Sequence, residues 1–276
     1  MDLEVVQKAH NFFGRKDWHK NVNSTVVFTN FIQLLLNLED EKRELIFELS
    51  ERFTWITSAE YQDLIAKVLK SIDVTVLGSI KKVILFPVHN EEDEGTKSGH
   101  AFLYLFKGLL PFNSLFDTIT VQIIEEYEEL LDEKLKINDQ TAIFLLDDFL
   151  GSGETIDNTL KEVKKNLAIK NKNLHVVSIA SQQQAVDFLL SEGIPLHTHY
   201  ISNKGITDNY SGPELNQKTE IMKEIELLIP KNKSPFGYNE SEALISLIRT
   251  PNNTFPIFWK EHKVGLKKFN PPFPRF

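Results

Sequence analysis

The sequence predicts an α/β protein whose core is a parallel sheet. After residue 78, short apolar runs alternate with stretches of helical apolar spacing, which is typical of a parallel sheet covered by helices. Before residue 78, only helical spacing occurs. We therefore expect an N-terminal α-helical lobe at residues 1–77, an α/β core at residues 78–259 and a C-terminal tail at residues 260–276.

The apolar patterns place the elements of both parts. In the lobe, helices are expected at 28–38, 40–53 and 58–72, and Thr57 with Glu60 is placed as a capping box for the third. In the core, strands are expected at 82–88, 118–123, 141–147, 174–180, 196–201 and 243–248. Helices are expected at 98–110, 125–133, 155–167, 183–192 and 214–229.

Composition narrows the classes of protein. With 276 residues, 41% of them hydrophobic and 25% charged, the chain is long enough to bury a sizeable core. The net charge of −8 argues against broad nucleic-acid affinity of the protein body. The absence of cysteine excludes disulfides and thiolate metal sites. No apolar run reaches the roughly 18 residues of a membrane span, so we expect a cytoplasmic protein without membrane contact.

Residues 142–155 carry the main functional signal. A buried strand runs into Asp147 and Asp148, and a glycine and hydroxyl loop then opens a helix. Free amides and the positive dipole end at a helix start suit a phosphate, while paired carboxylates suit sugar hydroxyls or Mg²⁺. A P-loop is excluded, because Asp148 stands where a glycine is needed and Glu154 where the lysine is needed. A strand-turn-helix with chance acids remains the alternative.

Residues 147–155 resemble the phosphoribosyl pyrophosphate (PRPP) signature of type I phosphoribosyltransferases. They depart from it at Phe149, usually a smaller aliphatic residue, and at Gly151, usually a small or hydroxylic side chain. The resemblance implies a Rossmann-like phosphoribosyltransferase core in which Asp147 and Asp148 hold the ribose hydroxyls and, through them, Mg²⁺. It also implies that the 5′-phosphate is wrapped by Gly151, Ser152, Gly153, Glu154 and Thr155.

The same resemblance implies a second loop. In the family, the loop after the first core strand holds pyrophosphate, and here Lys97, Ser98 and Gly99 offer a cation, a hydroxyl and amides for that task. A solvated surface loop is the alternative for these residues, and it is favoured for the acidic run at 91–94 over a share in Mg²⁺ binding. The family's basic lid is replaced by the acidic stretch 125–133, with Lys134 and Lys136 beside it, and this departure favours binding over catalysis.

The final third of the chain adds aromatic and basic residues. Phe255, Phe258 and Trp259 either pack in the core, the favoured interpretation, or stack on a ring, for which Phe258 and Trp259 are the candidates. The tail is basic and is interpreted as a disordered or surface-draped terminus, with docking to nucleic acid or an acidic partner as the alternative. His197 and His199 lack further metal ligands and are interpreted as packing or edge residues.

Three motifs together resemble a phosphoribosyltransferase branch of bacterial conflict and antiphage defence systems, the retron-type effectors. They are the Asp-Asp-Phe-Leu-Gly-Ser-Gly loop at 147–153, the Lys-Ser-Gly loop at 97–99 and the Asn-Thr-x-Pro-x-x-Trp ending at 253–259. The resemblance implies a toxic effector held by a reverse transcriptase and its DNA product. It implies an enzyme that uses PRPP or another ribose phosphate with Mg²⁺, with Asp147, Asp148 and Lys97 as catalytic residues. The alternatives are a non-catalytic nucleotide sensor or scaffold and a nucleoside- or NAD-cleaving hydrolase.

Overall fold

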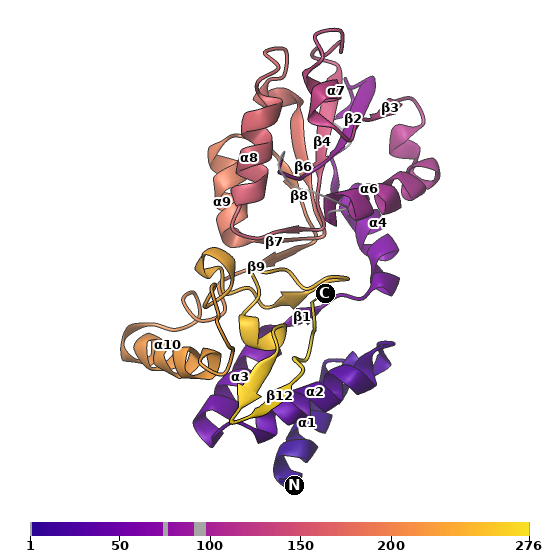
Figure 1. Ribbon diagram of the computed structural model, residues 1–276. Helices are drawn as coiled ribbons and strands as arrows, with labels where there is room; N and C mark the ends of the chain where they lie inside the picture. The colour runs from indigo at the N-terminus through magenta and orange to yellow at the C-terminus, as the bar shows by residue number, and fades with distance from the viewer. Residues whose placement is uncertain (1, 74–76, 91–97, 276) are drawn as a thin grey trace. The chain divides into compact units, whose positions relative to one another are not determined.

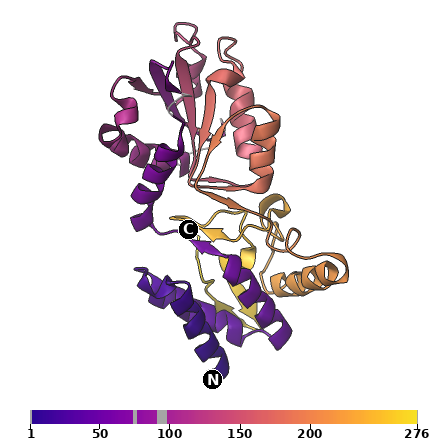
Figure 2. The same ribbon diagram turned by 180° about the vertical axis from the view of Figure 1, so that it is seen from behind.

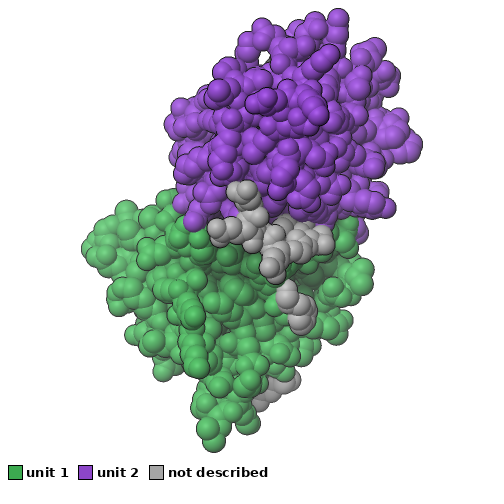
Figure 3. Space-filling model, turned by 45° about the horizontal axis from the view of Figure 1, so that its top comes forward, with its two compact units in different colours: residues 1–58, 203–276 green, residues 59–202 purple. Residues whose placement is uncertain are grey.

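The computed structural model describes residues 2–73, 77–90 and 98–275. The chain divides into two compact units, shown in separate colours in Figure 3. Unit 1 contains residues 1–58 and 203–276, and unit 2 contains residues 59–202. This division differs from the predicted domains at 1–77, 78–259 and 260–276. The two ends of the chain share one apolar core, and the third predicted helix of the lobe belongs to the unit that holds the sheet.

Unit 2 is built on a five-stranded parallel sheet (Figure 1). Its strand order is β3-β2-β4-β6-β8, and every neighbouring pair is parallel. The strands are β2 (Lys82–Pro87), β3 (Thr120–Ile123), β4 (Thr141–Leu146), β6 (Leu174–Val177) and β8 (Leu196–His197). All six residues of β4 are buried, as expected for a central parallel strand. The predicted α/β class with a parallel sheet is confirmed.

Helices cover both faces of this sheet (Figures 1 and 2). They are α4 (Tyr61–Ser71), α6 (Ser98–Leu109), α7 (Tyr127–Leu131), α8 (Glu154–Val163) and α9 (Gln183–Ser191). Ile143 and Leu145 of β4 pack with the apolar residues of α7, α8 and α9 on one face. Phe144, which lies between them in the strand, points to the other face and meets Phe106 of α6. The alternation of side chains along β4 thus divides the helices between the two faces.

A second, three-stranded parallel sheet continues the first. Its strands are β5 (Phe149–Leu150), β7 (Ala180–Gln182) and β9 (Tyr200–Ser202), in the order β5-β7-β9. Each follows β4, β6 or β8 after a two-residue break, at 147–148, 178–179 and 198–199. The strands predicted at 174–180 and 196–201 are therefore each split in two. The three breaks lie side by side, because Asp147 N donates to Val177 O and Ser178 N donates to His197 O.

Unit 1 is formed by the two ends of the chain. Its helices are α1 (Leu3–Arg15), α2 (Ser24–Leu36), α3 (Asp40–Arg52) and α10 (Gly212–Glu226). Two small sheets complete it: β1 (Thr54–Trp55) pairs parallel with β10 (Ile245–Ser246), and β11 (His262–Val264) pairs antiparallel with β12 (Lys267–Phe269). The strand predicted at 243–248 is thus only two residues long. The core joins rings from both ends of the chain, including Phe12, Phe31, Phe53, Phe258 and Phe273.

Short 3₁₀ turns connect several of these elements. They are η1 (Trp18–Lys20), η2 (Ser58–Glu60), η3 (Leu110–Phe112), η4 (Ser114–Phe116), η5 (Asn171–Asn173), η6 (Tyr238–Glu240) and η7 (Pro256–Phe258). The capping box predicted from Thr57 and Glu60 stays a prediction; η2 occupies Ser58–Glu60, and α4 begins directly after it at Tyr61. No helix in the described ranges is long and apolar enough to cross a membrane.

Candidate functional site

The acidic pair lies in the break between β4 and β5. Asp147 and Asp148 follow directly on the buried residues of β4, at the carboxyl end of a central parallel strand. Parallel sheets bind ligands at this edge, where the strands end and the loops leave them. The sequence prediction for the position of the pair rested on the same logic.

Two hydroxyl groups from different helices hold the acidic pair. Tyr61, the first residue of α4, donates from its Oη to Asp148 Oδ2 at 2.8 Å. Ser98, the first residue of α6, donates from its Oγ to Asp147 Oδ1 at 2.7 Å. The same Asp147 oxygen accepts the Asp148 backbone amide at 2.9 Å. Asp147 and Asp148 are only 7% and 8% exposed, so the pair is covered as well as bonded.

Burial and mutual repulsion set the charge state of the pair. Burial, and then the neighbouring Asp148 charge, raise the pKa of Asp147 well above the usual carboxyl value. Burial also raises the pKa of Asp148, whereas the hydrogen bond from Tyr61 lowers it in part. The pair therefore holds a proton more readily than exposed aspartates do. A ligand that brings hydroxyl donors or a cation stabilises its charged form.

The predicted phosphate loop follows the pair after β5. Gly151, Ser152 and Gly153 form the turn, and Glu154 and Thr155 begin α8. Gly153 has φ +85°, a left-handed conformation that glycine adopts without strain. The Glu154 amide donates to Ser152 Oγ at 3.4 Å. The first-turn amides of an α-helix have no partners within the helix, so the start of α8 has the donors that an anion needs.

The predicted pyrophosphate loop is described only in part. Lys97 lies outside the described residues, as do the acids at 91–94. Ser98 and Gly99 begin α6, and Ser98 reaches the acidic pair. A Cβ at Gly99 would lie 2.7 Å from Val88 O and 3.0 Å from Leu146 O. Glycine therefore allows α6 to begin directly against the carboxyl ends of β2 and β4.

The stretch that replaces the family's basic lid includes a short helix. Within the predicted helix 125–133, α7 spans only Tyr127–Leu131. Tyr127 is buried, and its Oη donates to His89 O at 2.5 Å. Thr159 of α8 donates to the same carbonyl at 3.1 Å. These bonds tie α7 to the end of β2 and to α8, so this segment is part of the folded core.

The aromatic candidates belong to unit 1. Phe258 is fully buried and its ring lies 4.9 Å from that of Phe53, so core packing, the favoured interpretation, is confirmed for it. The alternative that Phe258 stacks on a ligand ring is therefore wrong, because its side chain is not exposed. Trp259 is half-buried, its Nε1 donates to Thr254 O at 2.8 Å, and Lys260 Nζ lies 4.8 Å from its ring centre.

The basic tail is folded. Residues 262–269 form the β11–β12 hairpin, and Phe273 is buried against Phe53, with ring centres 4.7 Å apart. Asn30 Nδ2 donates to Pro271 O at 2.9 Å. The interpretation as a disordered or surface-draped terminus is therefore wrong, because Phe273 packs in the core of unit 1.

His175 and His197 contact each other in the sheet, whereas His199 is exposed in the break between β8 and β9. His175 Nδ1 and His197 Nε2 lie 3.3 Å apart on β6 and β8, and His199 contacts Tyr200. Burial, and then the His197 charge, lower the pKa of His175 to about 4. Within the part of the chain that the structure describes, no group of three or more histidine or acidic side chains could hold a metal ion.

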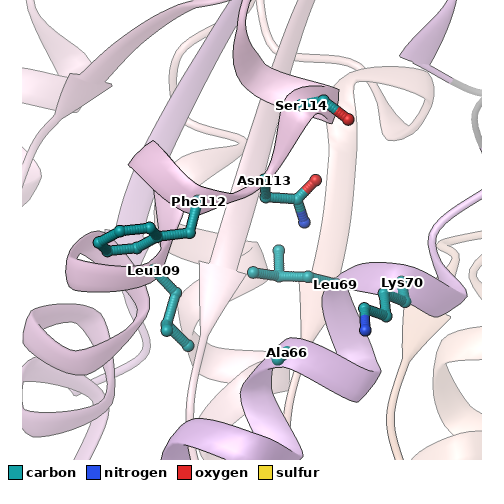
Figure 4. Close-up of a pocket in the computed structure, with 7 residues that line it drawn as sticks. All are labelled: Ala66, Leu69, Lys70, Leu109, Phe112, Asn113 and Ser114. Atoms are coloured by element: carbon teal, nitrogen blue, oxygen red, sulfur yellow. The ribbon is translucent and has the colours of Figure 1, made fainter.

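A cavity of about 270 Å³ lies elsewhere in unit 2 (Figure 4). It is lined by Ala66, Leu69, Lys70, Leu109, Phe112, Asn113 and Ser114. These residues come from α4, the end of α6 and the turns that follow it. None of them belongs to the acidic pair or to the glycine loop, so this cavity is separate from the candidate ribose phosphate site.

Sequence reasoning missed Tyr61. The residue precedes the predicted core, and its spacing with Leu64, Ile65 and Val68 indicated only a buried helix face. That interpretation is correct for the ring, which is 2% exposed, but it says nothing of the hydroxyl. The hydrogen bond joins residues 87 positions apart, and no local pattern reports such a pairing.

Comparison with known proteins gives a family match. The PRTase-CE family matches residues 28–275, far more than half of the chain. Comparison with curated proteins gives no match. Similar solved structures include the AQ2163 protein from Aquifex aeolicus, with 12% identity, coverage of 64% of this chain and 84% of that chain, and a TM-score of 0.33.

Two further structures are similar at the same level. A hypothetical protein from Neisseria gonorrhoeae with bound ppGpp has 13% identity, coverage of 62% of this chain and 97% of that chain, and a TM-score of 0.35. The xanthine-guanine-hypoxanthine phosphoribosyltransferase of Helicobacter pylori has 12% identity, coverage of 56% and 93%, and a TM-score of 0.32. At such TM-scores these likenesses carry no argument, and the family match stands on its own.

Proposed function

The chain belongs to the PRTase-CE family, and on that premise we propose that it binds PRPP or a related ribose 5-phosphate donor with Mg²⁺. The sugar phosphate is then transferred through C1 to an acceptor. The observation that carries the proposal is the acidic pair at the end of β4, followed by the glycine turn and the start of α8. Asp147 and Asp148 accept the ribose hydroxyls, and the turn and first helical amides hold the 5′-phosphate.

The residues fit the magnesium ion in one way. Two adjacent carboxylates are suitable oxygen ligands, and Mg²⁺ is commonly held by one or two carboxylates together with substrate phosphates. Asp147 and Asp148 would hold Mg²⁺ through the ribose hydroxyls that they bind, together with phosphate oxygens of the ligand. When bound, Mg²⁺ supplies neutralisation of the negative charge on pyrophosphate.

The protein's own contribution to transfer is positioning and charge. The C1–O bond to pyrophosphate breaks with the electron pair leaving on oxygen, and a C1–acceptor bond forms as the acceptor loses its proton to water. The transition state has oxocarbenium character, which an ionised acidic pair close to the ribose stabilises. Holding both ends of the sugar phosphate fixes C1 relative to the acceptor.

Calorimetry with PRPP and Mg²⁺ tests the binding part of the proposal. The Asp147→Asn/Asp148→Asn variant should lose binding, whereas Asp139→Asn, an exposed aspartate of the same unit, should bind as the wild type does. Since burial makes the charged pair costly, the double variant should remain folded, which circular dichroism checks. If the double variant bound PRPP as tightly as the wild type does, the assignment of Asp147 and Asp148 to the binding site would be contradicted.

One observation favours a second candidate, a non-catalytic nucleotide sensor or scaffold. The segment that corresponds to the family's basic lid contains α7, which is tied into the core through Tyr127. Residues 125–133 also include five glutamates and no lysine or arginine. Binding without turnover of PRPP, NAD⁺ or nucleotides would favour the sensor, and release of pyrophosphate from PRPP would favour the transferase.

The proposal extends to an effector role in antiphage defence, supported by the three motifs shared with that branch. Contact with a nucleic acid, such as the DNA product of a partner reverse transcriptase, would use the basic hairpin β11–β12, which carries Lys263, Lys267 and Lys268. The test is retention by single-stranded DNA of the Lys263→Gln/Lys267→Gln variant. Lys161→Gln/Lys172→Gln, on unit 2, is the matched control. Equal retention of both variants and the wild type would remove this part of the proposal.

A further inference from the structure

The acidic pair is already hydrogen-bonded to hydroxyl groups of the chain itself. Tyr61 Oη lies 2.8 Å from Asp148 Oδ2, and Ser98 Oγ lies 2.7 Å from Asp147 Oδ1. Each carboxylate thus receives one hydroxyl donor, and the donors come from the first residues of α4 and α6. A ribose presents the same chemistry, with its 2′ and 3′ hydroxyls donating one bond to each carboxylate.

The two hydroxyls also cover the site. Asp147 and Asp148 are almost completely buried, and the Tyr61 ring beside them is 2% exposed. Because Asp148 is 8% exposed, a ligand hydroxyl gains access to Oδ2 when the Tyr61 side chain moves away from it. A hydrogen bond to a charged acceptor is stronger than one between neutral groups, so the ligand competes with the bond from Tyr61.

From these contacts we infer that Tyr61 caps the acidic pair and that a vicinal diol displaces its hydroxyl from Asp148 when a ligand binds. The inference rests on the proposed function for the nature of the ligand. Tyr61 then competes with the ligand for Asp148 and lowers the affinity of the site for the ligand. It lies on α4, outside the core that the sequence predicts.

The position of Tyr61 suits such a movement. It is the first residue of α4 and follows directly on the 3₁₀ turn η2. The buried residues Leu64, Ile65 and Val68 hold the rest of the helix. Helix ends open at lower free-energy cost than helix interiors. The chain crosses from unit 1 to unit 2 between Ser58 and Ala59, so the cap lies three residues from Ser58 in the sequence.

The test compares Tyr61→Phe with the wild type by calorimetry with PRPP and Mg²⁺. The variant keeps the ring and removes only the competing hydroxyl, so its Kd should fall by about 10-fold. The matched control is Tyr104→Phe, since Tyr104 is in the same unit and 77% exposed, and its Kd should equal that of the wild type. An unchanged or raised Kd for Tyr61→Phe would overturn the cap and leave the proposed function standing.

A second measurement tests whether Tyr61 covers Asp148 when no ribose ligand is present. Carbodiimide and glycinamide label accessible carboxyl groups, and mass spectrometry reads the label on Asp148. Labelling should be several-fold faster in Tyr61→Phe than in Tyr104→Phe. If neither variant nor the wild type binds PRPP, the proposed function fails. The labelling rates still test whether Tyr61 covers Asp148: equal rates would overturn this inference, and a faster rate in Tyr61→Phe would support it.

Discussion

Units 1 and 2 are built in different ways. Unit 2 is one continuous stretch, residues 59–202, in which strands alternate with helices and the backbone ladder places the acidic pair. Unit 1 joins residues 1–58 to residues 203–276 through aromatic packing, and its sheets are only two-stranded. The comparison shows that the position of the acidic pair depends on the topology of the sheet. The association of the two chain ends depends instead on the packing of their side chains.

The substitution with the largest expected effect tests whether the tail is needed for the stability of unit 1. Phe273→Ala should lower the free energy of unfolding by about 3–5 kcal/mol, because the ring is buried and stacks on Phe53 at 4.7 Å. Chemical denaturation measures the change, and hydrogen exchange should place it in peptides of unit 1. Phe112→Ala is the control, since that ring of unit 2 is 86% exposed. Equal stability of the two variants would mean that the tail is dispensable.

The next effect is a pH dependence that arises from Glu226 in unit 1. Burial raises the pKa of Glu226, on α10, from 4.5 to about 7. A raised carboxyl pKa means that the folded state binds the proton more tightly, so stability falls as pH rises from about 4.5 to 7. The loss is up to about 3 kcal/mol. Glu226→Gln should remove it, so the stability difference between variant and wild type should widen across this range in denaturation at several pH values.

His175, in unit 2, should respond to pH in the opposite direction from Glu226. Burial lowers the pKa of His175 from 6.5 to about 4, so the folded state resists protonation. Its contribution to stability is present above pH 6.5 and is lost as pH falls towards 4, by up to about 3 kcal/mol. Hydrogen exchange at pH 5 and pH 7 should therefore show weaker protection of β6 at the lower pH. Protection of β6 that rises on acidification would contradict the opposite pH responses of His175 and Glu226.

The smallest expected effect concerns the fit of α6 against the sheet. Gly99→Ala places a Cβ 2.7 Å from Val88 O and should cost about 1–3 kcal/mol. Gly108→Ala, on the same helix, meets nothing within 4 Å and should stabilise the protein by about 0.5–1 kcal/mol. Thermal unfolding of the two variants gives the comparison. A stable Gly99→Ala variant with intact PRPP binding would show that the close approach is not needed.

The predictable parts of the fold are those with a local pattern. The strand at 82–87 and the helix at 183–191 lie within their predicted ranges, because four or more residues in sequence carry the signal. The breaks at 178–179 and 198–199 were missed, since neither contains a glycine or proline that would mark an interruption in the strand. The tail was misjudged because Phe273 finds its partner, Phe53, 220 positions away in the chain.

By itself, the sequence determined the α/β class, the position of Asp147 and Asp148 at the end of a buried strand and the glycine turn before a helix. Each of these is a matter of neighbouring residues, whose side chains and dihedral preferences act locally. Only the tertiary structure decided that Tyr61 and Ser98 bond the pair and that the two ends of the chain form one unit. These contacts join distant residues, and their partners depend on how the whole chain packs.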